Sequence, residues 1–174
     1  MLLLLKMGKI TILLLFLLMT SSMFSQDDFN KLPQAKTINI TYLIVPKIIG
    51  NERLLNSLAD TKEGIKSKIK EVSVFKDKPT RAGTEFYNLT EFGIILFELV
   101  ESPATKTQKE LNNFFGLDEQ TNVYVDGYLL ERKNYNIATN SIKEIELVQP
   151  DTVNLLKGTV LNIWTLEKGK RYKD

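Results

Sequence analysis

Residues 121–171 read TNVYVDGYLLERKNYNIATNSIKEIELVQPDTVNLLKGTVLNIWTLEKGKR. Three short apolar runs, at residues 123–125, 142–148 and 160–166, are separated by connectors rich in turn-forming residues. The pair Asp126-Gly127 follows the first run, and Asp-Gly between strands is a strong hairpin signal because Gly accepts a positive φ. We therefore expect this stretch to form a small β-rich unit.

The rest of the chain alternates short strand patterns with short helical ones. Period-two alternation or continuous apolar runs predict strands at residues 36–45, 71–75 and 92–100, the last of them either buried on both faces or central in its sheet. Helical spacing predicts a helix carrying Leu54, Leu55 and Leu58, which either continues past Gly64 or breaks there. We also expect a helix at 107–115 with a capping box, a helical turn at 151–157, and a weakly helical or looped segment at 132–141. This is an α+β pattern.

An internal repeat is visible in two segments. Residues 69–74 read IKEVSV and residues 142–147 read IKEIEL. Each is followed by a connector that contains proline, then by a glycine (Gly93 or Gly158) and a second apolar run. Although a chance match of this length is possible, the shared order favours two copies of one unit.

The second copy resembles the plug domain of TonB-dependent outer-membrane receptors in residues 124–127 (YVDG), 142–147 (IKEIEL) and 160–165 (VLNIWT). It departs from that pattern because the Tyr-Gly connector is missing and Gly158 sits one residue early. The first copy lacks Val-Asp-Gly but keeps Tyr87 and a Gly-led strand at 93–95. The chain is too short for a receptor barrel. The resemblance therefore implies an exported plug-like module with two β-α-β-β halves.

The expected organisation of the chain begins with a secretory signal. Lys6 and Lys9 precede an apolar run of about ten residues and a small-residue end, which is the anatomy of a signal peptide, with cleavage near Ser25. An uncleaved anchor is the alternative. The expected segments are a signal peptide at 1–25, a linker at 26–35, a first half at 36–103, a connecting helix at 104–120, a second half at 121–167, and a charged, solvated tail at 168–174.

Composition excludes several kinds of chemistry. The 174 residues contain no Cys and no His, which removes thiolate nucleophiles, imidazole bases, disulfides and Cys/His zinc sites. The formal charge of +2 comes from Lys6 and Lys9, and the remaining 21 basic and 21 acidic residues balance. Apart from these two lysines the chain is neutral, so it has no net positive charge to attract nucleic acid. We expect no enzyme activity, no cofactor, no metal, and no transmembrane span after signal cleavage.

Candidate site residues are few. Four acids are close in sequence: Asp126, Glu131, Glu144 and Glu146. They could act together in metal binding or acid–base catalysis, but the favoured interpretation is that they lie on a solvated face. Tyr124, Trp164 and Phe97 are the candidate binding residues, although a single Trp in a strand more often belongs to the core. Asp126, Gly127, Gly93 and Gly158 are expected to define the fold, the last two by starting strands where backbones pass closely.

Two functions follow as hypotheses. The first is a non-enzymatic module that acts by protein–protein contact in the periplasm or at the outer membrane of a Gram-negative-type bacterium, with linkage to TonB-dependent receptor systems. Its docking surface would be a strand edge left open at the junction of the two halves. The alternative is a small-molecule carrier with an apolar cleft between the halves, lined by Phe92, Phe97 and Trp164.

Overall fold

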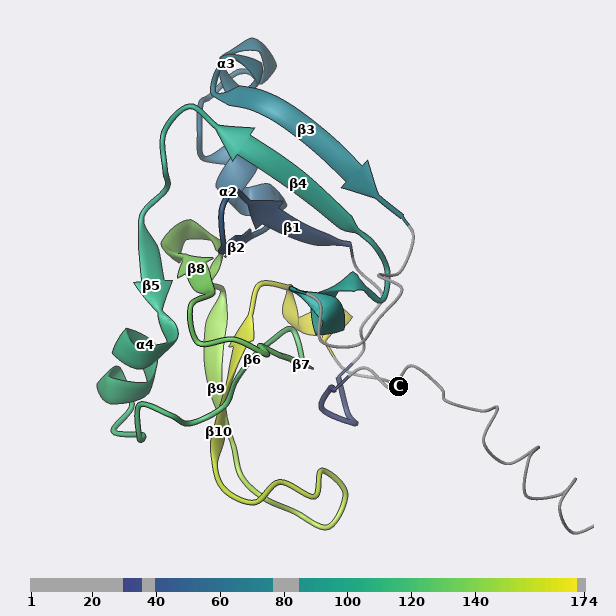
Figure 1. Cartoon of the computed structure of the whole chain (residues 1–174), viewed down its shortest axis with the longest axis vertical. Coiled ribbons are helices and arrows are strands. Elements are labelled where there is room, and N and C mark those ends of the chain that lie inside the picture. Colours follow the sequence, from purple (N-terminus) through teal and green to yellow (C-terminus); the bar gives the residue numbers. More distant parts are fainter. Residues whose placement is uncertain (1–29, 36–39, 77–84, 172–174) are drawn as a thin grey trace, which may run out of the picture.

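The computed structural model describes residues 30–35, 40–76 and 85–171. Within these ranges, ten strands form two mixed sheets and three short α-helices pack around them (Figure 1). This is the α+β class that the sequence predicts. The predicted signal peptide, residues 26–29 of the linker, and the start of the first predicted strand lie outside the described residues.

The larger sheet has six strands in the order β3-β4-β1-β2-β8-β5. β4 lies between β3 and β1, antiparallel to the first and parallel to the second, so the continuous apolar run is central, which is one of the two predicted alternatives. The strands are β1 (Thr41–Ile44), β2 (Ile48–Gly50), β3 (Ile69–Phe75), β4 (Ile94–Leu99), β5 (Thr105–Thr107) and β8 (Asn136–Ala138).

The smaller sheet has four strands in the order β7-β6-β10-β9. The hairpin predicted at Asp126-Gly127 is present, since β6 and β7 pair antiparallel on either side of it. Asp126 has a φ of 50° and Gly127 a φ of 87°, the two positive values that a tight hairpin turn needs. The strands are β6 (Val123–Val125), β7 (Tyr128–Leu129), β9 (Glu144–Val148) and β10 (Val160–Trp164).

Four strands of the larger sheet and the four strands of the smaller one follow the same order. β2-β1-β4-β3 corresponds to β7-β6-β10-β9, with a parallel central pair and antiparallel outer pairs in both. The segments IKEVSV and IKEIEL overlap the matching edge strands, β3 and β9. This common topology is an observation about strand order, and the internal repeat itself stays a prediction.

The helices are short and begin at side-chain caps. Asn51, Thr61 and Thr107 each accept a backbone N–H at the N-terminus of α2 (Glu52–Asn56), α3 (Lys62–Ser67) and α4 (Gln108–Phe114), respectively. The capping box predicted for α4 is confirmed, with Glu110 as its second member. α2 and α3 are separate, so the helical pattern breaks before Gly64. Single turns of 3₁₀ helix lie at Tyr87–Thr90 (η1), Thr139–Ser141 (η2) and Lys168–Lys170 (η3).

The core has three parts. The largest lies between the two sheets, a second lies beneath α2, and a third covers the outer face of the small sheet, where residues 30–35 pack. Buried side chains of the first include Leu43, Ile49, Ile94, Val123, Val125, Leu161 and Ile163. The two sheets therefore pack through a common core. None of the helices in the described ranges is long and apolar enough to cross a membrane.

Several local expectations are wrong. β2 and β8 were not predicted, and β8 joins the larger sheet although it lies within the predicted second half. Residues 151–157 form turns without a helix, because Leu155 has a φ of 53°, outside the right-handed helical region. The tail is not fully solvated, since Arg171 is buried and pairs with Glu144.

The two glycines that precede strands differ in their environment. Gly93 has a φ of 94°, and a Cβ there would lie 2.9 Å from the carbonyl oxygen of Phe75, so close backbone passage does require glycine. A Cβ at Gly158 would meet nothing within 4 Å. The packing reason expected for Gly158 is therefore wrong.

Candidate functional site

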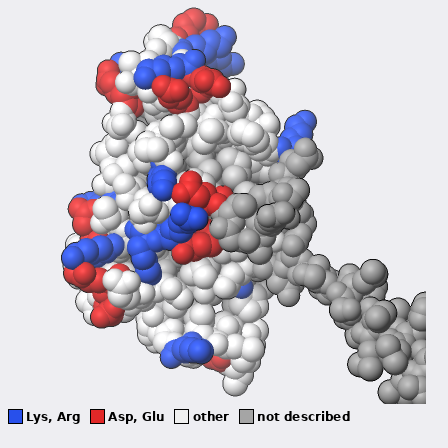
Figure 2. All heavy atoms as spheres, in the orientation of Figure 1, with Lys and Arg blue, Asp and Glu red and all other residues white. Residues whose placement is uncertain are grey.

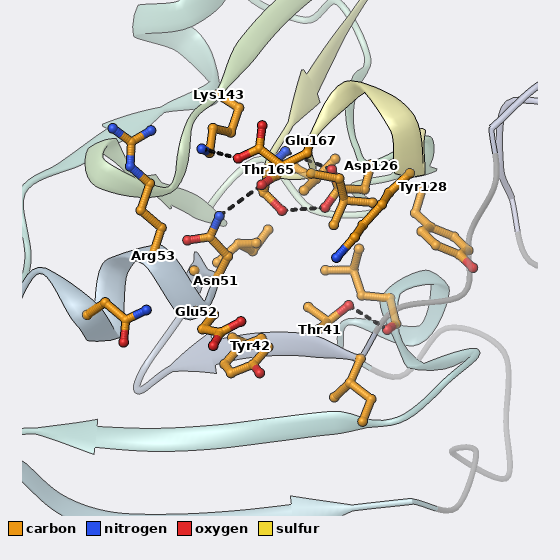
Figure 3. Close-up of a pocket in the computed structure, with 18 residues that line it drawn as sticks. Thr41, Tyr42, Asn51, Glu52, Arg53, Asp126, Tyr128, Lys143, Thr165 and Glu167 are labelled. Carbon is orange, nitrogen blue, oxygen red and sulfur yellow. Dashed lines mark hydrogen bonds and ion pairs between the residues drawn. The ribbon is translucent and has the colours of Figure 1, made fainter. Parts of the chain in front are cut away.

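A cavity of about 620 Å³ opens where the β1–β2 hairpin and α2 face the ends of β6 and β10 (Figure 3). It lies at the junction of the two predicted halves, because each half supplies part of its wall. The lining residues are mostly polar or charged towards α2 and apolar towards β1 and β6. Its polar and charged lining residues include Tyr42, Asn51, Glu52, Arg53, Asp126, Lys143, Thr165, Glu167 and Lys170.

Asn51 joins the two halves across the floor of this cavity. Its Oδ1 accepts the N–H of Leu54 at 3.1 Å and so caps α2. Its Nδ2 donates to the carbonyl oxygens of Ser141 at 3.2 Å and Thr165 at 3.0 Å, both in the second half. One side chain therefore serves as a helix cap and as a tertiary link, and its donors are fully used.

Asp126 completes the floor from the other side. One carboxylate oxygen accepts the Thr165 N–H at 2.7 Å, and the other accepts the Thr165 hydroxyl at 2.6 Å. Burial raises the pKa of Asp126 to about 6, although the hydrogen bonds from Thr165 act in the opposite direction. Thr165 is thus hydrogen-bonded to both Asn51 and Asp126. Because the polar groups of these three residues are already occupied, they are better suited to shaping a binding site than to catalysis.

The rim of the cavity is charged. Figure 3 shows Arg53, Lys143 and Glu167 on one side and Glu52 and Tyr42 on the other. Lys143 and Glu167 form an ion pair, and this contact, with the nearby charges of Arg171 and Arg53, lowers the pKa of Glu167. Burial and then the charge of Glu52 raise the pKa of the Tyr42 hydroxyl.

Replacing Asn51 by Asp is expected to lower the free energy of unfolding by about 1 to 3 kcal/mol. Asp caps helices as well as Asn does, so α2 keeps its cap. The variant loses both donors to Ser141 and Thr165 and places a carboxylate against their carbonyl oxygens. Urea denaturation measures the change.

The matched control is Thr61→Asp at the N-cap of α3, where the side chain accepts only the local N–H of Gly64. We expect a change of about 0.5 kcal/mol or less there. Equal effects at the two caps would contradict the tertiary role assigned to Asn51.

The three predicted binding residues are buried, and Phe97 lies apart from the other two. Tyr124 and Trp164 belong to the core on the outer face of the small sheet, whereas Phe97 belongs to the core beneath α2. Phe92 is exposed and does not line the cavity between the two predicted halves. A cleft lined by Phe92, Phe97 and Trp164 is therefore a wrong prediction, because alternation along β4 and β10 directs the two buried rings into different cores.

The four acids are also dispersed. Glu144 pairs with Arg171, Glu146 accepts the indole N–H of Trp164 at 2.7 Å, and Glu131 accepts the N–H of Asn88. Only Asp126 reaches the cavity. Across residues 30–35, 40–76 and 85–171, no group of three or more carboxylates could hold a metal ion.

Sequence reasoning missed Asn51 and Thr165. The pair Gly50-Asn51 reads as a turn, and the Asn before a helical pattern is an N-cap signal that could have drawn attention to it. No local signal announces Thr165, whose partners lie 39 and 114 positions away.

Comparison of the chain with protein-family profiles, curated proteins and solved structures finds no significant match.

Proposed function

We propose that the chain is an exported, non-enzymatic module with two plug-like halves that acts by protein–protein contact in the periplasm or at the outer membrane, in connection with TonB-dependent receptor systems. The quoted plug-like residues and the common strand order of the two halves support this proposal. The observation that carries the binding function is the free edge of β3, the longest edge strand described.

The edge expected at the junction of the halves is not the docking surface, since β8 pairs with β2 there. β3 has β4 on one side and no described strand on the other. Charged side chains and a bulge protect only the beginning of β3, at residues 69–71. Residues 72–75 of β3 are therefore the accessible part of the edge, with which another strand could pair.

Hydrogen-bond direction identifies the available backbone groups. Gly93 and Phe97 direct their carbonyl oxygens at β1, where they accept the N–H groups of Thr41 and Val45. Alternation along β4 then turns Ile94 and Leu96 towards β3, where they pair with Phe75 and Ser73. The N–H and C=O groups of Val72 and Val74 consequently point away from β4, towards the open edge.

The side chains at this edge are apolar and accessible. Val72 is 49% exposed and Val74 is 55% exposed, and both lie on the same face of the sheet. Figure 2 shows a largely uncharged surface over β3 and β4, with charged side chains gathered around α3. The partner that fits is an extended segment that adds a strand to β3 and carries apolar side chains at alternate positions.

A cross-linking experiment tests the proposal directly. The chain has no cysteine, so Val72→Cys introduces a single thiol at the edge for a thiol-reactive photo-cross-linker. We expect a specific adduct in cells from this position. Val153→Cys, exposed on the 151–157 turn, is the control and should not give that adduct. Identical adducts from both positions, or none from Val72→Cys together with a strictly monomeric protein, would overturn the proposal.

Val74→Pro in the Val72→Cys background should abolish the adduct while the protein stays folded. Proline removes an N–H that points to the open edge, so pairing with β4 is kept and the stability loss should be about 1 kcal/mol or less. Ser73→Pro removes an N–H that faces β4, and we expect it to lower stability by about 2 to 3 kcal/mol. Thermal unfolding of the two variants checks the assignment, which fails if their stabilities fall equally.

The cavity between the halves favours a second candidate function, small-molecule carriage. Its volume lies within the range of ordinary ligand sites, and it sits at the interface of two packed units. Saturable binding of a small molecule to this cavity tests the second candidate independently of β3.

A further inference from the structure

Within residues 30–35, 40–76 and 85–171, the two sheets end in four outer strands, β3 and β5 in the larger sheet and β7 and β9 in the smaller one (Figure 1). The edge of β7 is already occupied, because Lys31 forms an antiparallel bridge with Tyr128. The edges of β3, β5 and β9 have no described strand on their outer side. These three edges are therefore the ones that another strand could join.

The outward backbone groups of β9 are identified in the same way as those of β3. On β10, the backbone groups of Leu161 and Ile163 bond towards β6. Alternation turns the neighbouring residues of β10 towards β9, so the N–H and C=O groups of Ile145 and Leu147 point away from β10. These two residues flank Glu146.

The edge of β5 follows the same rule. On β8, Asn136 donates its N–H to the residue just before β2, so Ile137 turns towards β5 and pairs with Lys106. The outward groups of β5 then belong to Thr105 and Thr107, which flank Lys106. On β3, the outward groups of residues 72 and 74 flank Ser73.

Pairing with a second copy of the chain places the central residue of each edge opposite itself. In the two-fold antiparallel register that uses both outward residues, these form hydrogen-bonded pairs, and the two central residues lie about 4.5 Å apart between Cα atoms. β5 would bring together two copies of Lys106 and β9 two copies of Glu146, and like charges directly opposite are destabilising. β3 brings together two copies of Ser73, whose hydroxyl groups can form a hydrogen bond. Of these three described edges, β3 alone suits its own copy.

The other side chains of β3 agree with this register. Val72 of each copy lies opposite Val74 of the other, so four valines that are 49% or 55% exposed in one chain form a single apolar stripe. On the other face, Phe75, which is 55% exposed, lies opposite Glu71 of the second copy. The β-bulge at the beginning of β3 ends the pairing there. Self-association therefore covers the exposed apolar side chains of this edge.

We propose that β3 pairs antiparallel with β3 of a second copy of this chain, across a two-fold axis at Ser73, so that the two larger sheets become one continuous sheet. This inference rests on the edge docking of the proposed function and names its partner. The protein as isolated from the cell should sediment with twice the mass of one chain.

Ser73→Cys tests the position of the axis. It introduces the only thiol of the chain, opposite its own copy, at a Cα separation of about 4.5 Å that a disulfide can bridge. Mild oxidation should link this variant into dimers at least about ten times faster than Val153→Cys, whose exposed thiols meet only by collision. Equal rates for the two variants would overturn the axis at Ser73.

A mixture of Val72→Cys and Val74→Cys proteins, one of them isotopically labelled, tests the register. These two positions face each other at a Cα separation of about 5.5 Å, whereas identical positions lie diagonally at about 7 to 8 Å, beyond ordinary disulfide reach. Mass spectrometry should find more of the mixed disulfide than of both homodimers together. Equal amounts, the result of random pairing, would contradict the register.

Ser73→Glu gives β3 a like-charge centre such as that of β9, and it should weaken self-association at least about ten-fold in sedimentation experiments. Ser67→Glu, at an exposed position on α3, is the matched control and should leave self-association unchanged. Thermal unfolding checks that both variants fold. A monomeric wild type whose Val72→Cys variant still captures another protein in cells would overturn the second copy as partner and leave edge docking in place. Absence of both the dimer and the adduct would overturn both.

Discussion

Replacing Trp164 by Ala is expected to lower the free energy of unfolding by about 3 to 5 kcal/mol. The side chain is 1% exposed and packs with Leu32, Tyr124 and Val160 on the outer face of the small sheet. Its removal leaves a cavity beneath residues 30–35. The indole also donates to Glu146 at 2.7 Å, and the guanidinium carbon of Arg171 lies 5.3 Å from the ring centre. The variant loses all of these interactions together.

Trp164→Phe separates packing from the polar contacts. The phenyl ring fills most of the site but cannot donate to Glu146, so we expect a loss of about 1 to 2 kcal/mol. Denaturant unfolding of both variants provides the comparison. A loss below about 1 kcal/mol for Trp164→Ala would contradict the core assignment and return Trp164 to the set of candidate binding residues.

The elements that are predicted correctly have a recognisable pattern within their own residues. β4 is a continuous apolar run and proves central, and the Asp126-Gly127 pair forms the predicted hairpin. β2 and β8 have only three residues each, too few for a period to be read. β8 is a strand because β2 and β5 flank it, and that arrangement depends on residues far away in sequence.

The candidate site was harder to predict for the same reason. Asp126 draws attention through its turn, and Asn51 could have done so as a helix cap, because both are local features. The link from Asn51 to Thr165 joins residues 114 positions apart. Arg53 and Lys170 become neighbours of one cavity only after the two sheets have packed. Alternation predicts that a strand side chain is buried without saying in which core, which is why Phe97 and Trp164 were placed together wrongly.

Asp126→Asn is expected to remove a pH-dependent part of the protein's stability. Burial raises the pKa of Asp126 to about 6, from an ordinary value of 3.8. The folded state therefore binds this proton more tightly than the unfolded state. The resulting stabilisation is fully present below pH 3.8 and is lost as pH rises through about 6. A pKa difference of this size corresponds to about 3 kcal/mol.

The measurement is the free energy of unfolding of wild type and Asp126→Asn from pH 4 to pH 7. Other carboxyl groups titrate in both proteins, so they cancel in the difference between the two. Wild type minus variant should fall steadily over this range. A difference that stays flat would show that Asp126 keeps an ordinary pKa in the folded protein.

Two further substitutions at Asp126 separate the backbone from the side chain. Ala loses both acceptors for Thr165 and must hold a φ of 50°, so we expect a loss of about 3 to 5 kcal/mol at pH 7. Gly loses the same acceptors but adopts this φ freely, and it should recover about 1 kcal/mol of that loss. Asn tolerates positive φ and keeps one acceptor, so at pH 7 it should be the least affected of the three. That ranking follows only if the Asp126 carboxylate holds Thr165 in place, and it would be reversed if the turn needed backbone freedom alone.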